Sequence, residues 1–72
     1  MTVAELIAKL QEMPQDARVV VDGYEDGLKD ASLVQTIPVV LNANTSSWSG
    51  PHKQWESYMN VQPDETAVYI PR

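Results

Sequence analysis

Residues 2–22 of the chain read TVAELIAKLQEMPQDARVVVD, and this stretch decides the fold class. It begins with the spacing of a capping box, Thr2 and Glu5, whose side chains satisfy backbone amides at the start of a helix. Apolar residues then recur at helical spacing, at Val3, Leu6, Ile7, Leu10 and Met13. Pro14 disfavours helical geometry in the residue before it. We therefore predict an N-terminal helix that ends near residue 12 or 13 and directs one apolar face at the core.

A short valine-rich segment follows a turn at residues 14–17. Residues 18–22, RVVVD, form a β-branched run that is typical of a strand covered on both faces, so we place it in the centre of the sheet. Gly23 and Gly27 flank the polar residues after it. Because glycine tolerates positive φ, we expect the chain to reverse there.

Two further segments have extended patterns. Residues 32–43 carry apolar side chains on both faces but contain Pro38, which has no amide hydrogen for a ladder. We expect this strand at a sheet edge, bulged at Pro38, or split in two. Residues 66–70, TAVYI, follow a turn at residues 62–65 and predict a closing strand.

One helix followed by three strands predicts a single α+β domain over residues 1–72. In this αβββ arrangement the N-terminal helix packs on a small, mostly antiparallel three-stranded sheet. The helix covers one face only. Either the long segment at residues 44–62 or a second copy of the chain is then needed to cover the other.

Length and composition exclude several classes of protein. A chain of 72 residues without cysteine can form neither a disulfide framework nor a thiolate metal site, so self-association is the expected source of extra stability. No apolar run reaches the roughly 20 residues of a membrane span, which predicts a soluble, cytoplasmic protein. The formal net charge is −5 and the five basic residues are scattered, which argues against nucleic acid as a partner. The acidic residues form no run, so solubility explains them better than DNA mimicry does.

The segment at residues 44–58 is the best candidate for binding, since it contains both tryptophans, a tyrosine and the single histidine. Loops of this length are often functional, and aromatic rings there can stack on a planar base while polar side chains hold a phosphate or supply hydrogen bonds. The alternative is that both tryptophans fold back as a lid on the open face of the sheet, and the residue types do not separate the two cases. The candidate ligand-binding residues are Trp48, His52, Lys53, Trp55 and Tyr58, with Tyr24 and Arg72 as weaker candidates from the other end of the sheet.

The sequence gives little support for metal binding or catalysis. The acidic stretch at residues 22–27 is similar to a calcium loop, but Tyr24 and Leu33 stand where two of the ligands belong. That stretch can equally hydrogen-bond ribose hydroxyls or be a solvated turn. There is no cysteine nucleophile, and His52 with Glu56 four residues later is also the spacing of an ordinary surface pair. We expect a binding protein that is not an enzyme and uses no metal and no cofactor.

A resemblance adds a biological context. Residues 1–25, MTVAELIAKLQEMPQDARVVVDGYE, resemble the start of short uncharacterised proteins from bacteriophages, prophages and bacteria. In these proteins a helix, a Pro-x-Asp-Ala turn, a valine strand and a Gly-Tyr-Glu segment occur in this order, and a Gly-Pro-His motif can follow, here at residues 50–52. The resemblance implies phage ancestry and, for a phage-encoded protein, the cytoplasm of the host cell.

Small phage proteins of this size often counter host defence, and one class sequesters nucleotide-derived immune signals such as cyclic ADP-ribose derivatives. The resemblance thus leads to one expected function: a homo-oligomer that holds such a signal in a pocket between subunits. The alternative is an acidic protein-binding inhibitor or accessory protein that acts on a host protein through its apolar face, including by DNA mimicry.

Overall fold

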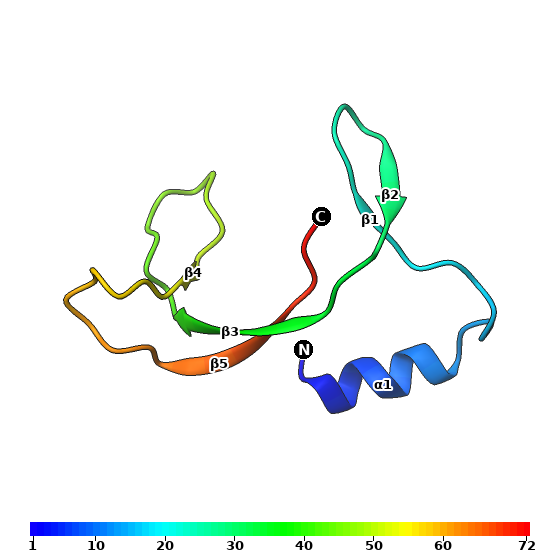
Figure 1. Ribbon diagram of the computed structural model, residues 1–72, viewed down its shortest axis with the longest axis horizontal. Coiled ribbons are helices and arrows are strands. Elements are labelled where there is room, and N and C mark those ends of the chain that lie inside the picture. Colours follow the sequence, from blue (N-terminus) through cyan, green and yellow to red (C-terminus); the bar gives the residue numbers. More distant parts are fainter. The chain divides into compact units, whose positions relative to one another are not determined.

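The computed structural model describes the whole chain, Met1 to Arg72, and has an α+β architecture. One helix precedes five strands: α1 (Val3–Gln11), β1 (Val20–Asp22), β2 (Leu28–Asp30), β3 (Gln35–Val40), β4 (Lys53–Gln54) and β5 (Glu65–Tyr69). They form a two-stranded sheet, β1-β2, and a three-stranded sheet in the order β4-β3-β5, all antiparallel (Figure 1). The α+β class is confirmed. The αβββ arrangement is wrong, because β2 and β4 were not predicted.

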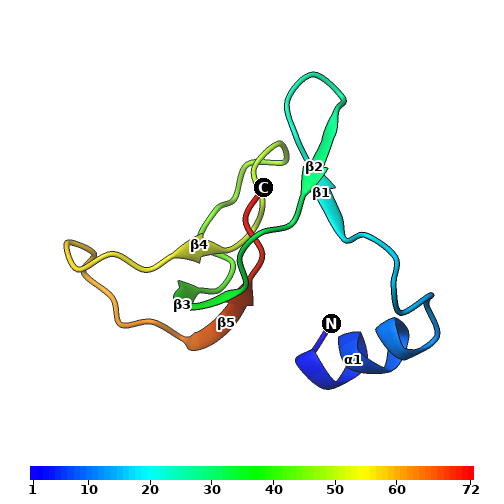
Figure 2. The ribbon, with the colours of Figure 1, turned by 45° about the vertical axis from the view of Figure 1, so that its right-hand side comes forward.

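The chain divides into two compact units. The N-terminal unit comprises Met1–Leu33 together with Ile70–Arg72, and the sheet unit comprises Val34–Tyr69. The helix and the β1-β2 hairpin belong to the first unit, while the three-stranded sheet belongs to the second (Figure 2).

Helix α1 begins as the capping pattern predicts. Thr2 is the N-cap with extended backbone, and its hydroxyl accepts a hydrogen bond from the Glu5 amide at 3.2 Å. The hydroxyl also donates to the Glu5 carboxylate at 3.1 Å. The helix ends at Gln11, close to the predicted end. No residue of α1 is buried.

The β1-β2 hairpin corrects two expectations about the valine segment. Strand β1 pairs only with β2, so it is not central in a sheet, and Val20 is exposed. The glycines after it do not adopt positive φ. Glu25 and Asp26 do, at 53° and 63°, between Tyr24 and Gly27.

The glycines of this hairpin have a steric role instead. A Cβ at Gly23 would lie 3.1 Å from the carbonyl oxygen of Gly27, and one at Gly27 would lie 3.2 Å from that of Tyr24. Both contacts accompany tight backbone hydrogen bonds, from Gly23 N to Gly27 O at 2.8 Å and from Gly27 N to Tyr24 O at 3.0 Å. Glycine suits both positions because a Cβ there would be in tight contact with a backbone carbonyl.

Strand β3 is central in its sheet and pairs with β5 in an unbroken register through Pro38. The expectation of an edge strand, a bulge at Pro38 or a split strand is therefore wrong. Within an antiparallel strand the N–H and C=O of one residue point to the same side. The Pro38 carbonyl accepts from the Trp55 amide at 2.9 Å, so the missing donor also faces the β4 side. The β4 ladder ends at the pair Val39–Gln54, next to Pro38, so the missing amide falls where pairing with β4 stops. The missing amide does not face β5, and pairing with β5 continues through Pro38.

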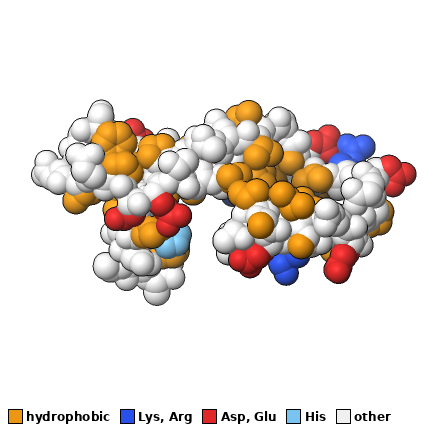
Figure 3. Space-filling view, turned by 90° about the horizontal axis from the view of Figure 1, so that it is seen from below, with side chains coloured by type: hydrophobic (Ala, Val, Ile, Leu, Met, Phe, Trp, Pro, Cys, Tyr) orange, Lys and Arg blue, Asp and Glu red, His pale blue; other side chains and the backbone are white.

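Burial is slight throughout the chain. Val39, on β3, is the only buried residue, at 7% exposure. Hydrophobic side chains on the α1 side of the N-terminal unit lie open at the surface (Figure 3), among them Val3, Ile7, Leu10 and Met13. A single buried side chain is far less apolar burial than a folded domain of this length ordinarily has.

Candidate binding hollow on the three-stranded sheet

The sheet unit has a shallow hollow of about 370 Å³ on one face of β4-β3-β5. It is lined by Ile37, Val39, His52, Lys53, Gln54, Ala67, Val68 and Tyr69. The residues come from all three strands and from the end of the loop before β4. Because the strands hold one another in register, their side chains are positioned by backbone pairing.

Strand register defines the face that forms the floor. Ile37 pairs with Ala67, and Val39 pairs with Gln54 on one side and Glu65 on the other. Residues that are directly paired share a face, and so do alternate residues along a strand. The apolar floor therefore consists of Ile37, Val39 and Ala67. Gln54 lies at one end, and Tyr69, opposite Gln35, lies at the other.

His52 is fixed at the Gln54 end of the hollow. Its Nδ1 accepts a hydrogen bond from the Asn42 amide at 3.1 Å, and its carbonyl accepts from the Asn44 side chain at 3.4 Å. A neutral imidazole that accepts at Nδ1 carries its proton on Nε2. His52, which lines the hollow, therefore carries a hydrogen-bond donor at Nε2, and the backbone amide of Asn42 sets this tautomer.

Acidic groups stand close to this histidine. The Asp64 carboxylate accepts from the amide of Leu41 at 2.7 Å, one residue before the amide that holds the imidazole. Glu65 shares the face of Val39 by register. Figure 3 shows the histidine side chain at the surface with acidic side chains beside it. The cation at this end is Lys53, which pairs with Val40 and so belongs by alternation to the other face.

Two predicted site residues thus meet in the hollow, His52 and Lys53. Sequence reasoning missed Tyr69, Gln54 and the apolar floor. Tyr69 lay within the predicted closing strand, but only the register between β5 and β3 places it on the same face as Val39. Gln54 lay in a segment that we read as a loop and that forms β4.

Trp48 and Tyr58 lie outside the hollow and are strongly exposed, at 86% and 74%. Trp48 is at the tip of the long β3-β4 connection. There the Ser49 amide donates to the Ser46 carbonyl at 3.3 Å, and the Asn44 side chain donates to the Gly50 carbonyl at 2.9 Å. Neither ring covers the sheet, so the interpretation of this segment as a lid fails for Trp48.

Trp55 has a structural role. Its indole Nε1 donates to the Val61 carbonyl at 2.7 Å, and its amide donates to Pro38. The ring is partly buried and closes the loop at residues 56–61. The two tryptophans that the sequence groups together therefore differ: one is free at a hairpin tip, and the other holds a loop.

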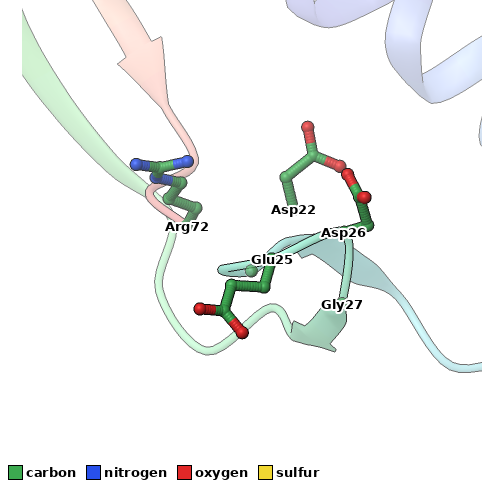
Figure 4. A pocket seen from close by; sticks show the side chains of 6 residues that line it. Asp22, Glu25, Asp26, Gly27 and Arg72 are labelled. Carbon is green, nitrogen blue, oxygen red and sulfur yellow. The ribbon is translucent and has the colours of Figure 1, made fainter.

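The weaker candidates Tyr24 and Arg72 meet in the N-terminal unit. The Arg72 guanidinium carbon lies 5.2 Å from the centre of the Tyr24 ring, a cation–π contact. Beside it a polar pocket of about 450 Å³ is lined by Arg72 and by the hairpin residues Asp22, Gly23, Glu25, Asp26 and Gly27 (Figure 4). Figure 4 shows the Asp22 and Asp26 carboxylates close together and Glu25 turned away from them. Three carboxylates and one guanidinium line this pocket, so its lining carries a net negative charge.

No cluster of three or more histidine, cysteine, aspartate or glutamate side chains is arranged to hold a metal ion. The chain also has no helix whose length and apolar character would allow it to cross a membrane. Comparison with protein-family models, with curated proteins and with solved structures finds no match to this chain.

Proposed function

We propose that this protein binds a small nucleotide-derived molecule in the hollow on the β4-β3-β5 sheet. The observation that carries the proposal is the lining of that hollow. An apolar floor lies between an aromatic ring, Tyr69, and hydrogen-bonding side chains, His52 and Gln54. Small-molecule sites combine an apolar lining with a few placed polar groups in this way.

The proposal is for binding without chemistry. His52 is a side chain of the hollow that could act as a general base, and its Nδ1 is occupied by the Asn42 amide. No serine, threonine or cysteine lines the hollow as a nucleophile. In a phage setting, as the resemblance implies, the protein sequesters a nucleotide-derived immune signal and so counters host defence.

Self-association belongs to this proposal. Three apolar residues of α1, Val3, Ile7 and Leu10, are about half exposed, between 46% and 53%, and the chain buries only Val39. Contact between copies would remove this apolar surface from water. The proposal keeps the pocket between subunits that the sequence led us to expect.

Protein binding is a second candidate function, favoured by one observation: the apolar face of α1 is uncovered. Amphipathic helices bind partner proteins through such a face. A Tyr69→Ala variant separates the candidates. It weakens nucleotide binding by the hollow in the first case and leaves partner binding through α1 unchanged in the second.

The hollow is tested by isothermal titration with adenosine, ADP, ADP-ribose and cyclic ADP-ribose. We expect at least one of these to bind and Tyr69→Ala to weaken binding about five- to a hundredfold, because stacking on an aromatic side chain contributes roughly 1–3 kcal/mol. Tyr69→Phe keeps the ring and should keep the affinity. Ser47→Ala, an exposed position outside the hollow, is the matched control. Absence of binding to all four compounds would refute the proposed function.

A further inference from the structure

The two ends of the hollow differ chemically. Tyr69 stands opposite Gln35, and Gln54 stands opposite Val39, so the two ends are four residues apart along β3. At about 3.3 Å per residue, this separates them by about 13 Å of backbone. One planar ring is too short to contact both ends.

The Tyr69 end suits an aromatic ring. The tyrosine is 41% exposed, and Ala67 lies two residues before it on the same face of β5. An alanine between an aromatic side chain and the Ile37 floor leaves room for a flat group to lie against both. No charged residue lines this end of the hollow.

The His52 end suits hydroxyl groups better than phosphates. His52 presents its Nε2 proton as a donor, and the Gln54 amide can both donate and accept. The Asp64 and Glu65 carboxylates nearby outnumber the single cation, Lys53, and so repel an anion. A hydroxyl, in contrast, can accept from His52 and donate to a carboxylate or an amide oxygen.

We infer that the hollow binds an elongated, two-ended ligand. Its aromatic ring lies on Tyr69, and a sugar-type group with free hydroxyls is held by Gln54, about 13 Å away along β3, and by His52 beyond it. Any phosphates between the ends face solvent. This inference rests on the proposed function and specifies its ligand class: a nucleotide extended by a second hydroxyl-bearing group.

The comparison of ADP with ADP-ribose tests the inference, because the two differ by the distal ribose. Calorimetry should show ADP-ribose binding about three- to tenfold more tightly than ADP, the effect of one or two hydrogen bonds. His52→Asn should remove this advantage and leave ADP affinity unchanged. An asparagine oxygen can replace Nδ1 as acceptor for the Asn42 amide, so the loop is preserved. His52→Gln, whose amide reaches the Nε2 position, should restore part of the advantage.

Two results would overturn the inference and leave the proposed function standing: equal affinities for ADP and ADP-ribose, or an equal loss of both in His52→Asn. Tyr69→Ala provides the reciprocal measurement, since it should weaken ADP and ADP-ribose alike. Failure of the native protein to bind adenosine, ADP, ADP-ribose or cyclic ADP-ribose would refute both the inference and the proposed function.

Discussion

Single residues of the same type have different roles in this chain, and the tryptophans are the clearest case. Trp48 is 86% exposed at a hairpin tip, whereas the Trp55 indole donates to the Val61 carbonyl at 2.7 Å. Both were candidate ligand-binding residues and both were candidate lid residues. Their surroundings, not their side-chain chemistry, separate them.

The tryptophan pair leads to a stability prediction. Trp48→Ala should change the free energy of unfolding by no more than about 0.5 kcal/mol, because it removes no packing. Trp55→Ala should cost about 1–3 kcal/mol, because it removes an indole hydrogen bond and leaves the Val61 carbonyl without its donor. Circular dichroism melts of the two variants, with Tyr58→Ala as a second exposed aromatic, measure this. Equal melting temperatures for Trp48→Ala and Trp55→Ala would contradict the assignment.

At the scale of elements, the turn of the β1-β2 hairpin has a backbone conformation that its amino acids do not favour. Its two residues with positive φ, Glu25 and Asp26, are not glycine or asparagine, the residues that tolerate this geometry best. The neighbouring glycines are required for close backbone approach. The turn therefore stores some backbone strain at two consecutive positions.

Replacing Glu25 and Asp26 by Asn and Gly should stabilise this hairpin by roughly 0.5–1.5 kcal/mol, since the pair suits a turn with two positive φ values. The control is Gly27→Ala, which should destabilise it because the new Cβ would meet the Tyr24 carbonyl at 3.2 Å. Chemical denaturation of the three proteins tests the expectation. A stabilising Gly27→Ala would show that the hairpin backbone is different from the one described.

At the scale of the whole molecule, the apolar residues exceed what one copy of the chain buries. Hydrophobic residues make up 43% of the sequence, yet one side chain, Val39, is buried. A chain of this size that buries so little apolar surface has little to offset the loss of conformational entropy on folding. Self-association through the α1 face is the expected remedy.

Sedimentation equilibrium at micromolar concentration should therefore give a mass that is a multiple of 8.0 kDa. Ile7→Glu should shift the protein toward the monomer and lower its melting temperature, because it places a charge in the contact between copies. Lys9→Glu, on the same helix outside the apolar face, is the charge-changing control. A stable, cooperatively melting monomer of the native chain would exclude this role for α1.

The sequence by itself determined the helix and strands whose formation depends on residues close together in the chain. Helix α1 was predicted from the capping residues Thr2 and Glu5 and from the position of Pro14. Strand β5 and most of β3 were predicted from the alternation of apolar residues. These features depend on helix capping, proline geometry and strand periodicity, which act over a few residues.

The tertiary structure alone decided which strands pair and which residues share a face. Strand β4 has two residues and no recognisable sequence pattern, yet it brings His52 and Gln54 to the face of Val39. Pro38 suggested an edge strand, but its missing donor coincides with the end of the β4 ladder. Register is a long-range property, because a shift of one residue moves every side chain of a strand to the opposite face. The composition of the hollow, with Tyr69 at one end and His52 at the other, therefore depends on pairing between segments far apart in the chain.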